Sequence, residues 1–203
     1  MDYPLADLIV KIIAAAGTIS VAILAIWGEK VRARLAGPKI QLSLRDTRGN
    51  LTQRGNGVKT AYFHVAVTNH RRWSPARNVR LLLTAVQTRA ADGSYSPEGV
   101  VHSVQLTWAF PQFHELSPTI AAKDMCDFGS LDDGAAAFVP SLYIMPNDFP
   151  GLVRPGESKR FSIVASADNY YSGTPLVLQV SWDGKWTADT EQLMKHLVVK
   201  EIT

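Results

Sequence analysis

The chain is poor in the residues that specialised scaffolds need. It has 203 residues and a single cysteine, Cys126. One cysteine excludes an internal disulfide and a zinc site built from several thiolates. Charged residues make up 19% of the chain, against roughly 25% in an average globular protein, so long disorder is not expected. We therefore expect one domain of ordinary size, alone or with an appendage.

Signatures of catalysis are also missing. The chain has no G-x-x-x-x-G-K-[ST], G-x-S-x-G, H-E-x-x-H or G-x-G-x-x-G motif, and its histidines are not spaced as metal pairs. We expect no enzyme activity, no metal and no cofactor. A hydrolase that uses Cys126 or a loop aspartate is the competing hypothesis.

The positive charge is concentrated at the amino terminus. The chain has 21 basic and 18 acidic residues, of which residues 1–45 hold six and three, so the remainder holds 15 of each (21 − 6 and 18 − 3). A neutral domain lacks the broad basic surface on which nucleic-acid binding depends. A nucleic-acid partner is therefore not expected.

A long apolar run begins at Leu8 and ends at Trp27, with Lys11 as its only charge. As an α-helix it would be about 30 Å long, which matches the hydrocarbon core of a bilayer. Two acids precede it, whereas a signal peptide begins with basic residues, and a buried soluble helix is rarely apolar all round. The sequence predicts a transmembrane helix over residues 8–28, with the lipid bilayer as a partner.

Basic residues follow this run directly, so the positive-inside rule places everything after it in the cytoplasm. We expect a short extracytoplasmic tail (1–7), the membrane helix (8–28), a basic juxtamembrane linker (29–38) and a cytoplasmic domain (39–203). The basic residues are Lys30, Arg32, Arg34 and Lys39.

Small residues recur on one face of the predicted membrane helix: Ala14, Gly17, Thr18 and Ala22. Such stripes let helix backbones approach closely in lipid. The pattern indicates self-association, although small residues also occur on faces that contact only lipid.

Apolar and polar residues alternate after Gly37 and Pro38, as in half-buried strands. No amphipathic helix of useful length separates these segments, which favours two packed antiparallel sheets. We expect an all-β fold, an immunoglobulin-like or C2-like antiparallel β-sandwich. The segments are KIQLSL, TAYFHVAVTN, NVRLLLTAV, HSVQLTW, SLYIM, KRFSIVAS, LVLQVSW and LVVKEI.

Residues 109–137 show no clear periodicity and are predicted to form a long loop. Its four carboxylates suggest either a solvated acidic loop or a calcium site, but the spacing fits no EF-hand. A second irregular segment, TADTEQLMKH, is predicted to form one or two helical turns, capped by Thr187, Asp189 or Thr190. The carboxylates are Asp124, Asp127, Asp132 and Asp133.

Two groups of residues are candidates for binding. Guanidinium groups and an indole lie close together at 71–77 and suit a phosphate or nucleotide, although a solvated hairpin loop has the same composition. A second group of aromatics is expected to form a partner surface or a small satellite core. The first group is Arg71, Arg72, Trp73 and Arg77, and the second is Phe110, Phe113 and Trp186.

Trp186 is assigned to the surface because Asp183 and Gly184 are expected to form a two-residue hairpin. Strand alternation then places Trp182 in the core and Trp186 on the opposite face.

The sequence thus predicts a single-pass membrane protein whose cytoplasmic sandwich is a binding or assembly module, self-associating or bound to another membrane or cytoplasmic protein. The alternative is a membrane effector whose sandwich senses a small anionic ligand or nucleotide and drives assembly of the membrane helix.

Overall fold

The computed structural model describes residues 3–98, 103–110 and 115–202. Side chains are described for these residues except 3, 5, 6, 24, 26, 27 and 29–35, which lie in the N-terminal helix. The chain divides into two compact units, Met1–Gly37 and Pro38–Thr203.

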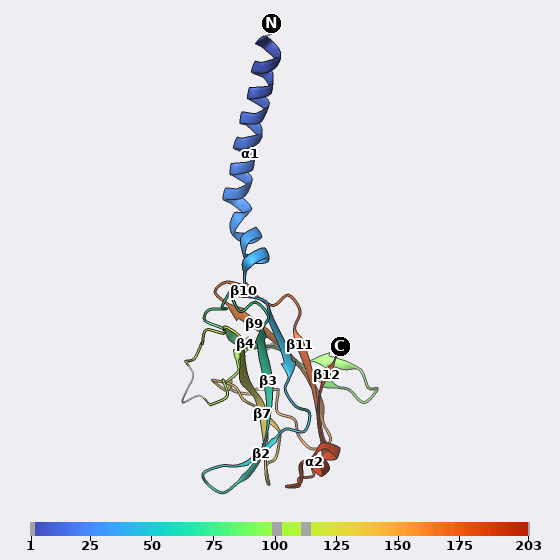
Figure 1. The fold of residues 1–203 in the computed structure, drawn as a ribbon. Helices are drawn as coiled ribbons and strands as arrows, with labels where there is room; N and C mark the ends of the chain where they lie inside the picture. The colour runs from blue at the N-terminus through green and yellow to red at the C-terminus, as the bar shows by residue number, and fades with distance from the viewer. Residues whose placement is uncertain (1–2, 99–102, 111–114, 203) are drawn as a thin grey trace. The chain divides into compact units, whose positions relative to one another are not determined.

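The first unit is one helix of 34 residues, α1 (Tyr3–Ala36), coloured blue in Figure 1. It ends where Gly37 and Pro38 follow, because proline cannot continue the hydrogen-bond ladder. Inside the helix, the hydroxyl of Thr18 donates to the carbonyl of Ala14 over 2.9 Å, and that of Ser20 donates one turn back over 2.8 Å.

Large apolar side chains of α1 are exposed. Eight of them are between 49% and 67% exposed. Among the described residues, however, no helix combines the length and the apolar character that a membrane crossing needs. The transmembrane helix expected over 8–28 is therefore not confirmed. The exposed residues are Leu8, Ile9, Val10, Ile12, Ile13, Ile19, Val21 and Ile23.

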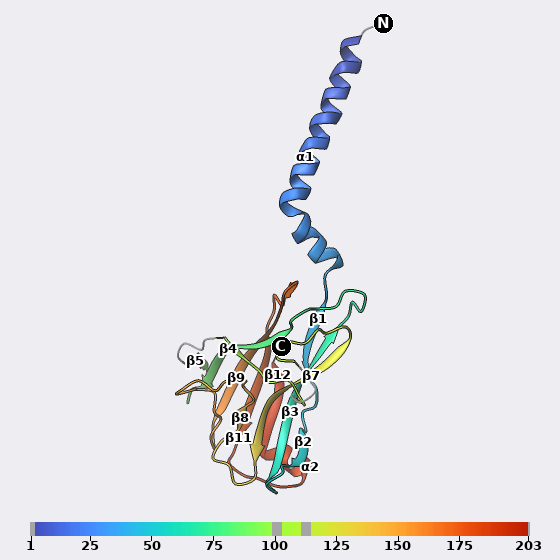
Figure 2. The ribbon, with the colours of Figure 1, turned by 90° about the vertical axis from the view of Figure 1, so that its left-hand side faces the viewer.

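The second unit consists of two antiparallel sheets, which confirms the all-β, sandwich-like prediction (Figure 2). The first sheet has the order β1 (Ile40–Leu44), β3 (Lys59–Asn69), β7 (Lys123–Asp132) and β8 (Val139–Pro140), and β2 (Asn50–Gln53) also pairs with β3.

The second sheet has the order β12 (Leu197–Ile202), β11 (Leu176–Trp182), β9 (Ser158–Ala167), β4 (Arg80–Arg89) and β5 (Tyr95–Pro97). Two short strands extend it: β10 (Tyr170–Tyr171) pairs with β9, and β6 (Val104–Gln105) pairs with β4. A short helix, α2 (Thr190–His196), precedes β12 and is capped by Asp189, one of the three predicted caps.

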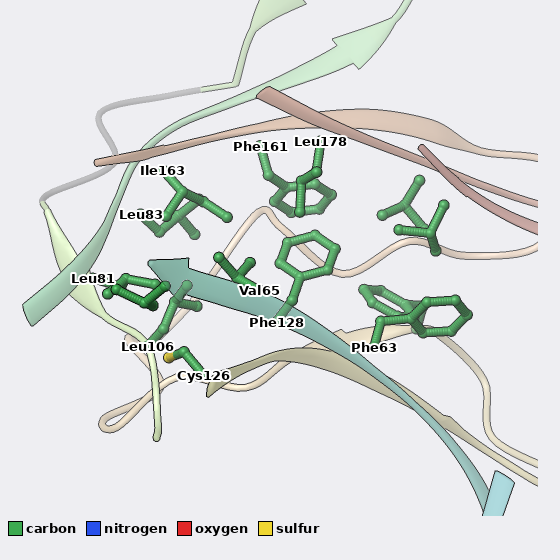
Figure 3. Packing of buried hydrophobic residues seen from close by; sticks show 14 of the residues in the cluster. Phe63, Val65, Leu81, Leu83, Leu106, Cys126, Phe128, Phe161, Ile163 and Leu178 are labelled. Carbon is green, nitrogen blue, oxygen red and sulfur yellow. The ribbon is translucent and has the colours of Figure 1, made fainter. Parts of the chain in front are cut away.

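Alternate residues of the long strands form the core between the sheets (Figure 3). Phe128 of the first sheet contacts Phe161 of the second edge-to-face, with ring centroids 5.4 Å apart. Every buried member of this core lies between Ile40 and Val199. Since the sandwich has its own contiguous core, we expect Pro38–Thr203 to fold without α1.

The prediction of a loop over 109–137 is wrong in its second half, which contains the central strand β7. Cys126 and Phe128 face the core, while Asp127 pairs with His64 on the outer face, 3.2 Å away. The alternation is masked by Gly129, where an added Cβ would lie 2.5 Å from the ring of Phe138. No group of carboxylates, histidines or cysteines able to hold a metal is present within the described ranges.

Two other predicted strand features are wrong. The segment SLYIM forms no strand, because Pro140 and Pro146 flank it and Tyr143 and Ile144 are exposed. No two-residue hairpin forms at Asp183 either, since β11 leads through a longer loop and α2 before β12 returns beside it.

Candidate functional site

The outer face of the first sheet presents a short ladder of side chains across three strands. The register aligns Gln41 with Thr68 and Thr68 with Lys123. In the next rung it aligns Ser43 with Ala66 and Ala66 with Met125. These residues face outward because the alternate residues of the same strands point into the core.

Two adjoining hollows of about 480 and 570 Å³ lie over this ladder. They share Ser43, Thr68 and Lys123, and we call them together the basin. Its floor is low because Ser43, Ala66 and Thr68 have short side chains. The other lining residues are Gln41, Arg45, Asn69, His70, Arg72, Ala109, Phe110, Ala122, Asp124 and Met125.

The rim of the basin is basic. Arg45 directly follows β1, Lys123 is the first residue of β7, and Arg72 lies in the loop after β3. In the part of the chain that the structure describes, no carboxylate pairs with the side chain of Arg72 or Lys123. Asp124 is the one acidic residue in the described lining, so the basin carries a net positive charge.

A buried asparagine holds the loop that carries Arg72. The side-chain oxygen of Asn69 accepts from the backbone N–H groups of Lys39 (3.1 Å) and Arg71 (3.0 Å). Its amide donates to the carbonyls of Ser74 (2.9 Å) and Ile120 (3.2 Å). Because all four bonds of this buried group are made, the loop is held in place before any ligand arrives.

His70 is fixed at the same edge. Its Nε2 donates to Oε1 of Gln41 over 2.6 Å, and its backbone N–H donates to the carbonyl of Lys39. The ring is therefore held in one orientation beside Arg72 on the basin wall.

Phe110 lines the other side of the basin in an unusual conformation. Its φ is +57°, in the left-handed region that non-glycine residues rarely adopt, and its side chain is 57% exposed. The preceding Ala109 is bonded to the edge of β7, since its N–H donates to the carbonyl of Met125. An exposed aromatic in strained backbone beside cations is typical of a functional surface.

These groups are suited to one kind of chemistry. Guanidinium and ammonium groups donate to phosphate or carboxylate oxygens, and an exposed aromatic ring can stack on a planar base. The short floor residues leave room for such a ligand, and each of the two hollows is within the usual size range of ligand sites.

The structure brings together two of the residues singled out in the sequence, Arg72 and Phe110, which come from different candidate groups. Arg77 lies elsewhere: its backbone carbonyl accepts from Asp168, and its N–H lies 3.4 Å from Asn169 Oδ1. Trp73 is 76% exposed, and Arg71 is half-buried. Neither lines the basin.

The remaining candidates are dispersed. Trp186 is half-buried and packs against the core near α2, far along the chain from Phe110. Phe113 lies outside the described residues. The small residues Ala14, Gly17, Thr18 and Ala22 are exposed on α1.

Cys126 is not available as a nucleophile. Burial, followed by the charges of Asp127 and Asp124, raises the pKa of its thiol well above the usual value. The sulfur donates to the carbonyl of Thr107 over 2.9 Å. The thiol is therefore a protonated core group, which argues against a hydrolase that uses Cys126 as its nucleophile.

The floor of the basin was missed in the sequence, because Ser43, Ala66 and Thr68 belong to two strands and become neighbours only through strand register. Arg45 and Lys123 were missed for the same reason. Comparison with protein-family models, curated proteins and solved structures found no match to this chain.

Proposed function

We propose that this protein is a membrane-anchored binding module, in which α1 crosses the bilayer and the sandwich binds an anionic, phosphate-bearing ligand in the basin on the cytoplasmic side. The observation that carries the binding proposal is the low floor of Ser43, Ala66 and Thr68 surrounded by Arg45, Arg72 and Lys123.

The anchor is supported by the exposed apolar side chains of α1. Exposing so many large apolar groups to water on one helix is unfavourable, whereas lipid would cover them. The polar groups within this stretch are satisfied locally, since the hydroxyls of Thr18 and Ser20 bond inside the helix and Lys11 pairs with Asp7 over 2.7 Å. The proposed crossing extends to Trp27 and so passes beyond the continuous run of described side chains, Asp7 to Ile23.

The direction of insertion rests on the basic residues that follow the crossing, and it can be tested in cells. A reporter that is active only outside the cytoplasm, fused after Thr203, is expected to be silent, and alkaline carbonate should leave the full chain in the membrane. Release of the chain by carbonate, or an active reporter, would contradict the anchor or its orientation.

The binding site is tested with ATP and inorganic pyrophosphate as probes, titrated into the isolated sandwich (residues 38–203) by calorimetry. The double variant Arg72→Gln/Lys123→Gln should weaken both probes about tenfold or more for each lost cation. The matched control Arg89→Gln/Lys185→Gln removes the same charge away from the basin and should leave binding unchanged. Binding of neither probe, or equal weakening by both variants, would contradict the proposal.

A sensor that drives assembly is the second candidate, and the exposed stripe of small residues on α1 is the observation that favours it. Under this hypothesis, ligand binding in the basin changes the number of chains that associate in the membrane. Crosslinking of the full chain with and without ATP distinguishes the two candidates, because a simple binding module gives the same crosslinked species in both cases.

A further inference from the structure

The sandwich, Pro38–Thr203, has 17 basic and 15 acidic residues, and the excess of basic residues lies at one of its two ends. At the end where β1 begins, residues 37–40, 69–80, 115–122 and 166–175 contain five basic and two acidic residues, a net charge of 5 − 2 = +3. We call these segments the basic end. The basic residues are Lys39, Arg71, Arg72, Arg77 and Arg80, and the acidic ones are Glu115 and Asp168.

The opposite end consists of residues 54–59, 132–135, 154–157 and 183–196, with five basic and six acidic residues, 5 − 6 = −1. We call these segments the acidic end. In Figure 1, β10 marks the basic end of the sandwich, and α2 with the turn after β2 marks the acidic end.

Two exposed aromatic side chains belong to the basic end. Trp73 is 76% exposed in the loop after β3, and Tyr171 is 64% exposed in β10. Tryptophan and tyrosine favour the membrane interface, where the ring enters the boundary region and the polar atom stays hydrated.

The loops of the basic end are fastened to one another, so they present one surface. Asn169 donates to the carbonyl of Pro75 over 3.3 Å, and Asn78 donates to Asp168 over 2.6 Å. The hydroxyl of Tyr170 donates to the carbonyl of Ile40 over 3.0 Å. The bond from Asn78 also occupies the carboxylate of Asp168, one of the two opposing charges.

Chain length keeps this end near the proposed crossing. From Trp27 to Ala36 the helix rises about 14 Å, and the four steps from Ala36 to Ile40 reach about 14 Å when extended. The start of β1 is therefore at most about 28 Å from the hydrocarbon boundary. Contact with the membrane becomes an intramolecular event with a high effective concentration.

We infer that the basic end docks on the anionic headgroups of the leaflet next to it, with the side chains of Lys39, Arg77 and Arg80 near lipid phosphates and Trp73 and Tyr171 in the interface. The inference rests on the proposed membrane anchor. It concerns a different surface from the basin, with Arg72 at the boundary of the two.

The isolated sandwich (residues 38–203) tests the docking without α1. We expect it to co-sediment with vesicles of phosphatidylcholine and phosphatidylserine, to bind less as salt is raised, and not to bind phosphatidylcholine alone. Arg77→Gln/Arg80→Gln should weaken vesicle binding about fivefold for each lost cation. Trp73→Ala should weaken it while leaving most of the salt dependence.

The matched control is Arg89→Gln/Lys185→Gln, which removes two charges that lie outside the basic end and should not weaken vesicle binding. Equal weakening by the two double variants, or no binding to the anionic vesicles, would overturn the inference. The two experiments distinguish a failure of the docking from a failure of the membrane anchor. If carbonate releases the full chain, the anchor fails whatever the vesicles show, and if the chain stays in the membrane while the sandwich ignores vesicles, only the docking fails.

Discussion

Lys159 is the charged side chain most deeply enclosed in the described part of the sandwich, with 3% of its surface exposed. Its Nζ lies 2.8 Å from a carboxylate oxygen of Glu98 and 3.7 Å from one of Glu157, and it donates to the carbonyl of Pro150 over 2.6 Å. A buried ammonium is tolerated only with such partners. The pair fastens the segment after β5 to the start of β9.

The ion pair between Lys159 and Glu98 depends on pH through the carboxyl group of Glu98. Burial alone would raise its pKa, but the hydrogen bond from Lys159 and the charges of Lys159 and Arg154 outweigh burial, so the pKa is lowered. A carboxyl whose pKa is lower in the folded state stabilises the protein above its unfolded pKa, and this contribution disappears as the pH falls through the folded pKa.

We therefore expect Glu98→Gln to reduce the free energy of unfolding near neutral pH by about 1–3 kcal/mol, because it leaves a buried charge with fewer partners. The loss should shrink in acid, where the parent protein also lacks the Glu98 charge. Urea unfolding at several pH values measures it. A loss that stayed constant down to the acid range would show that the ion pair is not its source.

The two tryptophans near α2 differ in burial and should differ in energy. Trp182 is 4% exposed, and its Nε1 donates to the carbonyl of Lys185 over 3.0 Å, whereas Trp186 is half-buried. Trp182→Ala should cost about 3–5 kcal/mol, as large-to-small core changes do, and Trp186→Ala clearly less. Equal losses in chemical denaturation would mean that the loop before α2 packs differently.

Phe110 allows strain and binding to be separated. Glycine adopts a positive φ with less strain than alanine. The free energy of unfolding of Phe110→Gly should therefore be about 1 kcal/mol larger than that of Phe110→Ala. Both variants lack the ring and should lose affinity for ATP more than for pyrophosphate, because stacking acts only on the base. Equal stability of the two variants would contradict the strained backbone, and unchanged ATP affinity would contradict stacking.

At the scale of elements, the alternation of apolar and polar residues predicts a strand correctly when it continues without interruption along the whole strand. It predicts β3, β4, β9, β11 and β12 because each has a clear apolar face. It fails for β7, where Gly129 takes a core position that the ring of Phe138 fills. It also fails at Asp183, because a turn-forming pair does not show that the next strand is delayed by a helix.

The helix α1 yields a prediction that does not involve the sandwich. Replacing Ala14, Thr18 and Ala22 with leucine keeps the apolar length but fills the small-residue face on which backbones would approach. We expect insertion to persist and crosslinked oligomers in membranes to decrease. A crosslinked species that is the same in parent and variant, or a parent that is only monomeric, would show that α1 does not mediate association.

For the whole molecule, part of the candidate site can be predicted from the sequence and the rest cannot. Arg72 and Phe110 stand out locally because an arginine pair and an aromatic cluster are visible in short windows. The floor of the basin depends on register between β1, β3 and β7, which short windows do not contain. Nearly equal totals of basic and acidic residues likewise suggest a domain of little charge, whereas the fold gathers the excess of basic residues at one end.

This sorting gives the sandwich an electric dipole along its strands. In the field of an anionic leaflet, a body with a positive and a negative end experiences a torque, because one end is attracted and the other repelled. Under the proposed docking, this torque would hold the sandwich upright, with α2 and the turn after β2 farthest from the lipid. The torque is strongest within a Debye length of the surface, so salt that weakens it would let the sandwich tumble on its tether.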